Sequence, residues 1–389
     1  MVLCYTLNKN WGDDIMFDLS NSFVESEHFD FLLLNKNCVI AEFYVDKKLD
    51  SICVTKVLCD LPSWVTDLDV FIGNRRSPKH RENIKELLKL SGCDTILGWL
   101  QVSHALSLVD TFWVKPKGSN LMWEDVSLYT HDFNEVIAKT AFEGGLHGIG
   151  LSTTSPEYGT DGSFAKCWVR EDGQIKMLKR GSSGARNAGL EPYSEFYAGQ
   201  VIREFTKDYV PYDLRSVSGR VCSTCHIFTS EKFGYLPYAA VDRGNSNVRK
   251  VLDVMDRYGL GEKARRMFVI DAVIMNEDRH KNNFGFLINN DTQEIVDMAP
   301  LFDHNLSLLP YAEEADFNNI SEYLKGKGPR LDEDWVRVAA RCLTPETRKT
   351  LIRLQDFEFE KHPKHNLPDW RLEQLSGLVR KMAKDILEF

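Results

Sequence analysis

The stretch that decides the fold is residues 275–309, MNEDRHKNNFGFLINNDTQEIVDMAPLFDHNLSLL. Its pattern predicts the end of a helix, a polar loop, a strand, a turn at Asn289-Asn290-Asp291, a second strand and a second polar corner. Asp278 stands just before this hairpin and Asp303 just after it. Because the strands of a hairpin run antiparallel, we expect the two carboxylates at the same end of it.

Two acids and an asparagine in this order are typical of phosphoryl-transfer enzymes of the kinase type. In these enzymes one Asp orients and deprotonates the attacking hydroxyl, while a second Asp and an Asn hold Mg²⁺ on the phosphates. The Asn of a kinase catalytic loop follows the Asp by five residues, and Asn283 follows Asp278 by five residues. Asn305 stands where glycine is common, and asparagine tolerates a left-handed backbone at such a turn.

Upstream segments contain the other parts of a kinase site in the required order. FAKCWVRE and QIKMLKRG, joined by the dipeptide Asp172-Gly173, predict a two-stranded hairpin, and Lys179 lies near the end of its second strand. Glu195 follows 16 residues later, in a helix predicted from residue 191 to about 205. A kinase needs such a lysine to contact the nucleotide phosphates and such an acid to hold it.

Two of these assignments have alternatives close by in the sequence. Lys176 lies on the opposite face of the same strand, so only one of the two lysines can face the site. Glu191 or Glu204 could replace Glu195 on the predicted helix.

A glycine-rich segment precedes the lysine hairpin. Residues 144–162 hold six glycines, where the 25 glycines of the whole chain predict about one. Within LSTTSPEYGTDGSF, residues 151–164, Gly159, Gly162 and Ser163 are candidates for covering nucleotide phosphates with backbone N–H groups. We expect self-phosphorylation of this loop, and the candidate hydroxyls are those of Ser152, Thr153, Thr154, Ser155 and Ser163.

NEDRHKNNFGFL followed by APLFDHNLSL resembles the catalytic core of HipA-like serine/threonine kinases, bacterial kinases with a two-lobed fold often encoded in toxin–antitoxin pairs. The resemblance implies an ATP- and Mg²⁺-dependent enzyme that acts on a protein substrate and has an antitoxin-like partner. It makes Asp278 the catalytic base, Asn283 and Asp303 the Mg²⁺ ligands, and Lys179 the nucleotide lysine. It covers residues 150–310, whereas residues 1–145 do not resemble the small barrel that begins HipA.

Two other interpretations stay open. Residues 278–283 also resemble the D-R-H-x-x-N loop of phosphoinositide lipid kinases, in which the histidine, here His280, often serves as the base. The second alternative, from a different functional class, is a non-catalytic kinase-like binding module that acts through protein contacts.

Length and the glycine-rich boundary together predict an α+β protein in three parts. A chain of 389 residues favours two or three domains. We expect a separate mixed α/β domain at residues 1–145, a β-rich small kinase lobe at 146–245 and a helical large lobe at 246–389. Within the first part, Ser77 and Pro78 predict a helix from residue 78 to 90.

Composition disfavours polyanionic partners and export. The net charge of −9 gives no electrostatic reason to bind nucleic acid or an anionic membrane. The longest apolar stretch, residues 95–114, is interrupted by polar side chains and is not expected to span a bilayer. Nine scattered cysteines suit reduced thiols, and no secretory signal is readable at the amino terminus, so we expect a cytoplasmic protein.

Overall fold

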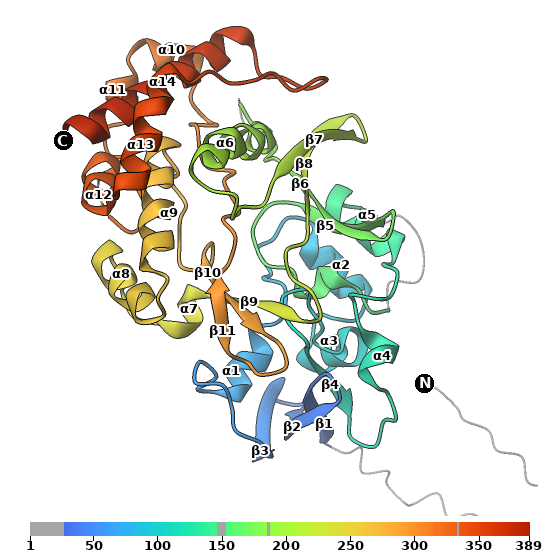
Figure 1. Cartoon of the computed structure of the whole chain (residues 1–389). Helices are drawn as coiled ribbons and strands as arrows, with labels where there is room; N and C mark the ends of the chain where they lie inside the picture. Colours follow the sequence, from blue (N-terminus) through green and yellow to red (C-terminus); the bar gives the residue numbers. More distant parts are fainter. Residues whose placement is uncertain (1–26, 146–152, 185–186, 333) are drawn as a thin grey trace, which may run out of the picture.

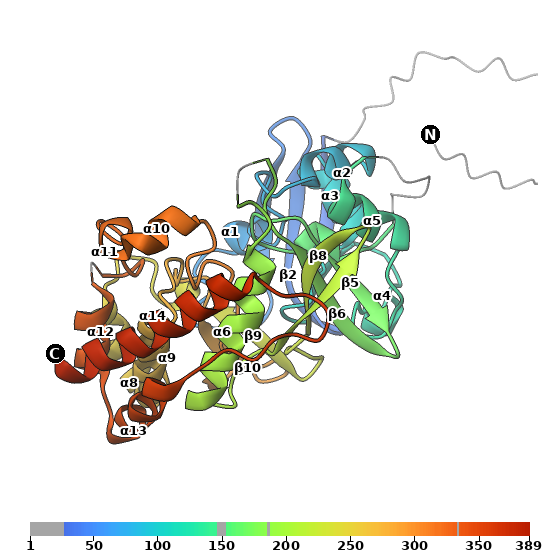
Figure 2. The same cartoon turned by 90° about the horizontal axis from the view of Figure 1, so that it is seen from above.

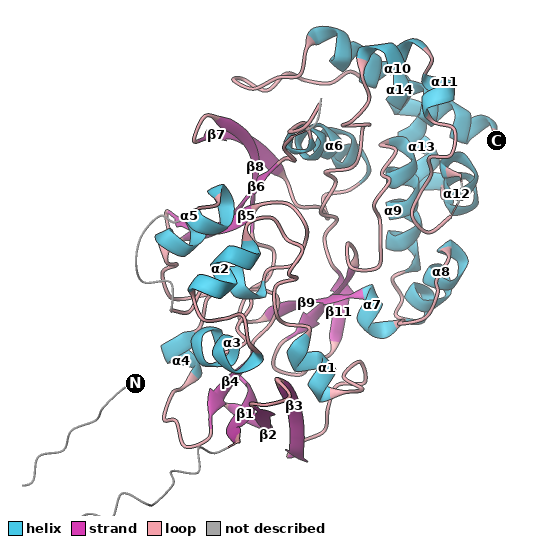
Figure 3. Ribbon diagram, turned by 180° about the vertical axis from the view of Figure 1, so that it is seen from behind, coloured by secondary structure: helices cyan, strands magenta, loops and turns pink. Residues whose placement is uncertain are grey.

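The computed structural model describes residues 27–145, 153–184, 187–332 and 334–389. Within these ranges the chain forms three antiparallel sheets and a large helical part, which confirms the α+β prediction. The helices α8 to α14 gather on one side of the molecule and most of the strands lie on the other (Figure 1, Figure 3).

The N-terminal unit is a four-stranded sheet covered by short helices. Its strands, in the order β3-β2-β1-β4, are β1 (His28–Asn35), β2 (Cys38–Asp46), β3 (Ser51–Val57) and β4 (Phe112–Pro116). The helices are α1 (Leu68–Gly73), α2 (Ile84–Leu90), α3 (Ile96–Ser103), α4 (Trp123–Val126) and α5 (Glu135–Glu143). Alternating apolar residues of β1 and β2, such as Phe31 and Phe43, are buried beneath these helices.

The helix predicted at residues 78–90 begins six residues late, because long-range contacts take up its N-terminal signals. Helix α2 begins at Ile84. The hydroxyl of Ser77, the predicted cap, donates instead to Thr160 O at 2.7 Å. Arg81 is only 2% exposed and binds the carboxylate of Glu157 at 2.7 Å, which requires residues 78–83 to form turns.

The second sheet confirms the lysine hairpin. Its order is β5-β6-β8-β7, with β5 (Lys166–Glu171), β6 (Gln174–Arg180), β7 (Tyr212–Val217) and β8 (Arg220–His226). The predicted turn Asp172-Gly173 joins β5 to β6, and helix α6 (Glu191–Phe205) has the predicted bounds. Figure 2 shows α6 between this sheet and the C-terminal helix α14 (Asp369–Glu388).

The N-terminal unit has a sheet of its own, but its packing is shared with the second sheet. Ala138 and Phe142 of α5 pack against Cys167 and Leu178 of the β5–β6 hairpin. Tyr158, from the short 3₁₀ helix η1 (Pro156–Gly159), is buried in the core of the N-terminal unit. The N-terminal unit is therefore joined to the second sheet by buried contacts, and the expected boundary at residue 145/146 adjoins residues outside the described part.

The third sheet, of order β11-β10-β9, lies next to the helical part. It consists of β9 (Phe233–Pro237), β10 (Gly285–Asn289) and β11 (Ile295–Met298), so the hairpin predicted within residues 275–309 is confirmed. The helices are α7 (Tyr238–Val241), α8 (Val248–Arg257), α9 (Gly261–Val273), α10 (Glu314–Asn318), α11 (Ile320–Tyr323), α12 (Trp335–Cys342) and α13 (Pro345–Arg353), the 3₁₀ helix η2 (Leu354–Asp356) and α14. Among the described residues, every helix is too short or too polar to span a bilayer.

Candidate active site

Lys179 binds two carboxylates that come from different parts of the chain. Its Nζ lies 2.8 Å from Glu195 Oε1 and also contacts Asp303 Oδ1. The lysine comes from β6, the glutamate from α6, and the aspartate from the corner after β11. The side chains of Lys179 and Glu195 are 7% and 1% exposed, so the cluster has little water to screen its charges.

The strand register explains how this cluster is held. On β6, Lys179 is paired with Ser223 of β8, whose hydroxyl donates to the second carboxylate oxygen of Glu195. Lys176 lies on the other face of β6 and binds Glu171 at 3.3 Å. The structure therefore brings Lys179, and not Lys176, to the carboxylates.

The alternatives to Glu195 lie elsewhere. Glu191 is buried at the start of α6, where it accepts a hydrogen bond from Tyr311 Oη at 2.8 Å. Glu204 is exposed near the other end of the helix. Glu195 is thus the acid of α6 that reaches Lys179.

Burial and charge act in opposite directions on this cluster. Burial by itself would lower the pKa of Lys179, but the carboxylates of Asp303 and Glu195 outweigh it and raise the pKa above its ordinary value. Burial would likewise raise the pKa of Asp303, but Lys179 and then Lys166 hold it well below its ordinary value. Lys179 is therefore a cation and Asp303 an anion at neutral pH.

Asp303 has the left-handed backbone conformation that the sequence analysis expected for Asn305. Its φ is +58°, whereas Asn305 is not among the described residues with positive φ. The prediction for Asn305 was wrong because Asp303 must turn its carboxylate toward Lys179 at the corner after β11. Aspartate is one of the few residues that adopt this conformation at modest cost. Its N–H donates to Tyr212 Oη at 3.1 Å, which fixes the corner against β7.

The predicted catalytic loop is organised around a buried arginine that the sequence interpretation missed. Arg279 is 1% exposed, and its guanidinium binds both carboxylate oxygens of Asp271 at 2.9 Å. The same guanidinium donates to Asn283 O at 2.7 Å and to Phe302 O at 3.0 Å. Arg279 therefore ties the loop of Asp278 to the corner of Asp303, and its position between Asp278 and His280 was the only available signal.

Asp278 and Asn283 are close to each other within this loop. Asn283 Nδ2 donates to Asp278 O at 3.1 Å, and the Asp278 N–H donates to Asn276 Oδ1 at 3.0 Å. Burial raises the pKa of the Asp278 carboxyl, although the nearby His280 partly offsets this effect. His280 Nε2 lies 3.8 Å from Asp278 Oδ2, and its side chain is 37% exposed.

A second lysine, Lys166, faces the same site and was not predicted. It is directly opposite Lys179 in the β5–β6 ladder and only 6% exposed. Its Nζ donates to Asp161 O at 2.8 Å. Burial, and then the positive charge of Lys179, lower the pKa of Lys166 to about 8. The two-residue turn at Asp172-Gly173 contained the signal, because it sets a register in which residue 166 meets residue 179.

The candidate residues of the glycine-rich segment have different surroundings in the structure. At Gly159, a Cβ would lie 2.6 Å from Leu106 O, so this glycine serves close packing against the N-terminal unit. At Gly162, φ is +100° and a Cβ would lie 2.1 Å from Lys166 Nζ. Ser163 is exposed next to it. Gly162 is thus beside Lys166, with Ser163 next to it in the chain, whereas Gly159 packs elsewhere.

The expected self-phosphorylation sites also differ in access. Thr153 and Ser163 are exposed and Thr154 is half-buried, whereas Ser155 is buried as the cap of η1. Ser152 lies outside the described residues.

The residues present fit a nucleotide-bound Mg²⁺ better than a protein-held metal. Within the described part of the chain, no group of three or more His, Cys, Asp or Glu side chains could hold a metal ion. Asn283 uses its amide NH₂ on Asp278 O, and the amide oxygen is the atom that Mg²⁺ would take. Mg²⁺ commonly binds one or two protein oxygens together with phosphates and water. Asn283 and Asp303 could supply such oxygens.

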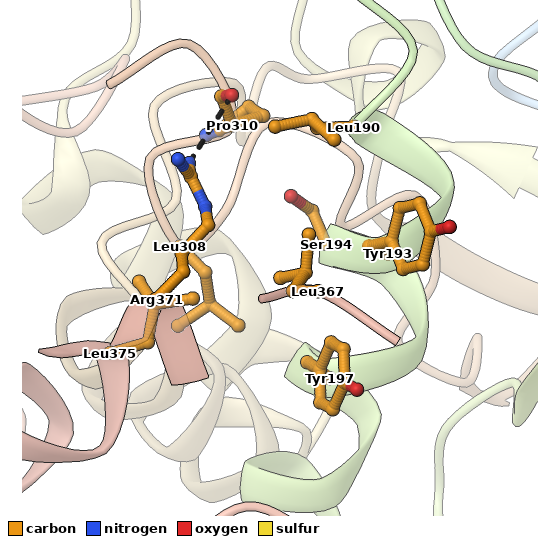
Figure 4. A pocket seen from close by; sticks show the side chains of 9 residues that line it. All are labelled: Leu190, Tyr193, Ser194, Tyr197, Leu308, Pro310, Leu367, Arg371 and Leu375. Carbon is orange, nitrogen blue, oxygen red and sulfur yellow. Dashed lines mark hydrogen bonds between the residues drawn. The ribbon is translucent and has the colours of Figure 1, made fainter. Parts of the chain in front are cut away.

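Among the described residues, one small cavity and one open pocket lie outside this cluster. One, of about 10 Å³, lies between α6, α14 and residues 308–310, where Arg371 donates to Pro310 O (Figure 4). It is the size of one water molecule and cannot hold a nucleotide. A larger open pocket of about 620 Å³ lies beside residues 226–232 and the β5–β6 turn. No predicted site residue lines either cavity, so the site is defined by its side chains.

Comparisons with known proteins come from structure and not from sequence. No family model and no curated protein match the sequence. The Helicobacter pylori proinflammatory kinase CtkA matches with a TM-score of 0.48 and 16% identity, over 60% of this chain and 92% of that chain. HipA of Shewanella oneidensis MR-1, solved with HipB and operator DNA, matches with a TM-score of 0.49 and 9% identity, over 92% of this chain and 97% of that chain. The likeness is one of fold. The assignment of a function rests on the site itself.

Proposed function

We propose that the protein is an ATP- and Mg²⁺-dependent kinase of the HipA-like type that phosphorylates a serine or threonine hydroxyl of a protein. The observation that carries the proposal is the meeting of Lys179, Glu195 and Asp303 in one buried cluster. A strand lysine held by a helix acid, next to a metal-binding Asp, is the arrangement with which kinases position the transferred phosphoryl group.

Each residue has a role that its surroundings support. Lys179 and Lys166 are cations that can contact the nucleotide phosphates, and Glu195 keeps Lys179 in place. Asp278, whose pKa is raised by burial, can orient the acceptor hydroxyl and take its proton. Asn283 and Asp303 would hold Mg²⁺, which neutralises charge on the transferring group. Arg279 links the two loops through its hydrogen bonds to Asn283 O and Phe302 O.

Transfer of label from γ-labelled ATP tests the proposal. The wild type should label a general serine/threonine protein substrate, and Asp278→Ala and Asp303→Ala should not. Asp297→Ala is the matched control, because Asp297 lies on β11 and pairs with Lys263, away from the cluster. Equal labelling by the wild type and both site variants would show that the cluster does no phosphoryl transfer, as the binding-module alternative requires.

The same assay separates the lipid kinase alternative. That alternative assigns the base role to His280, which is half-exposed beside Asp278. Label that appears on phosphoinositide vesicles alone, and is lost in His280→Ala, would favour it.

Self-phosphorylation and an antitoxin-like partner are further parts of the proposal. Mass spectrometry of the peptide 151–166 after incubation with ATP tests the first, and the absence of phosphate there would rule it out. HipB accompanies HipA in the solved complex, and a partner of that kind, like a cytoplasmic location, stays a prediction for this chain.

A further inference from the structure

The loop between α11 and α12 lies along the predicted catalytic loop. Lys327 Nζ binds the Glu277 carboxylate at 3.0 and 3.1 Å. At the end of the same loop, Trp335 Nε1 donates to Asn276 O at 3.3 Å. Two consecutive residues that precede Asp278 are therefore each contacted by a residue about 50 to 60 positions later in the chain.

A third residue of this loop, Arg330, lies beside the proposed catalytic base, Asp278. Its Nη1 lies 3.7 Å from Asp278 Oδ1, which is an ion-pair distance but too long for a hydrogen bond. The Arg330 side chain is 62% exposed, whereas Pro329 beside it is buried and anchors the loop. The loop thus presents an exposed guanidinium next to the carboxylate to which an acceptor hydroxyl must come.

The basic side chains of this loop differ in their partners. Residues 324–331, LKGKGPRL, carry three basic side chains, and three acidic residues follow them at 332–334. Lys325 binds Glu322 and Lys327 binds Glu277, so both of these lysines already have acidic partners. No hydrogen bond of the Arg330 side chain is found among the described residues, and its five N–H groups can serve an incoming anion.

We propose that Arg330 determines acceptor specificity by binding an anionic group, such as the carboxylate of an acidic residue, beside the hydroxyl to be phosphorylated. This inference rests on the proposed kinase function. An acidic side chain next to the target serine would draw the guanidinium away from Asp278 and form a charge-assisted hydrogen bond with it. The acceptor is accordingly an acidic segment of a protein.

Steady-state phosphorylation of three matched serine peptides tests this inference. The peptides differ only in flanking residues, which are glutamate, glutamine or lysine. The wild type should have the highest kcat/KM with the glutamate peptide. In Arg330→Ala the ratio of kcat/KM for glutamate to glutamine peptide should fall about tenfold, the value of one charge-assisted hydrogen bond. In Arg330→Glu the preference should reverse toward the lysine peptide.

Lys325→Ala is the matched control, because this lysine lies in the same loop but pairs with Glu322 away from the catalytic loop. It should keep the wild-type ratio. An unchanged ratio in Arg330→Ala would overturn the inference, as would an equal gain in activity with all three peptides, which indicates an inhibitory latch. An equal rise in KM for ATP with every peptide would place Arg330 on the nucleotide and also overturn it.

The outcomes separate this inference from the function on which it rests. A wild type that labels itself, or the glutamine peptide, but shows no preference for glutamate refutes only the role of Arg330. A wild type that transfers no label to itself, to any peptide or to any protein refutes the kinase function together with it.

Discussion

Replacing Lys179 with methionine removes the cation that two carboxylates share while keeping the volume of the side chain. Glu195 is 1% exposed and Asp303 is 26% exposed, so at least one uncompensated charge would stay buried. Breaking a buried ion pair in this way costs about 3–5 kcal/mol. We therefore expect Lys179→Met to lower the free energy of unfolding by that amount, with the larger share due to Glu195.

The same substitution at Lys176 is the control. Lys176 and Glu171 are 23% and 34% exposed, and their pair should contribute at most about 1 kcal/mol. The double variant Lys179→Met/Glu195→Gln should recover about 1–3 kcal/mol relative to Lys179→Met, because it also removes the buried charge. Burial raises the pKa of Glu195 even beside Lys179, and the loss of Lys179 removes the effect that opposes this rise. The deficit should therefore shrink as pH falls, beginning above the ordinary pKa of a glutamate, because Glu195 becomes neutral in the folded variant before it does in the unfolded chain.

Urea unfolding, followed by the fluorescence of the eight tryptophans and by circular dichroism, measures these differences. The two signals must coincide for a two-state value to be used. If Lys176→Met is as destabilising as Lys179→Met, or the double variant is as unstable as the sum of the single ones, Lys179 does not hold the two carboxylates.

Three other predictions concern transfer and nucleotide binding. Asp278→Asn should lower kcat by about 10²–10⁴ with little change in the Kd for ATP, measured by calorimetry. In the wild type, kcat should fall as pH falls through a midpoint above 3.8, because the pKa of Asp278 is raised. An unchanged kcat in the variant would exclude Asp278 as the base. Burial and Lys179 lower the pKa of Lys166 to about 8, so the KM for ATP should rise in the wild type as pH rises above about 8. In Lys166→Arg the KM should not rise, because the arginine side chain stays charged. Parallel pH profiles of the two proteins would show that Lys166 does not contact the phosphates. Gly162→Ala should raise the KM for ATP several-fold, because the added Cβ would displace Lys166 Nζ. Gly118→Ala is the control for backbone strain alone, because Gly118 has a φ of +92° and no atom within 4 Å of an added Cβ. Equal effects of the two substitutions on the KM would contradict this role for Gly162.

The sequence by itself determined several elements and the order of the site residues. The bounds of α6, the β5–β6 hairpin and the β10–β11 hairpin follow from turn dipeptides and from alternation or helical spacing. The spacing from Asp278 to Asn283 and the order of lysine, glutamate and aspartate follow from the same reading. Apart from the order of the three charged residues, these signals are local, since they depend on residues within one turn, strand or helix.

Only the tertiary structure decided which side chains meet. The choice of Lys179 over Lys176 became definite when Asp303, 124 residues later, contacted one of them. Helix α2 begins late because Arg81 binds Glu157, 76 residues away. The meeting of Arg330 with Asp278 likewise joins two distant loops. The energy of a buried charge depends on partners that are distant in the chain, and this is why no local pattern predicts them.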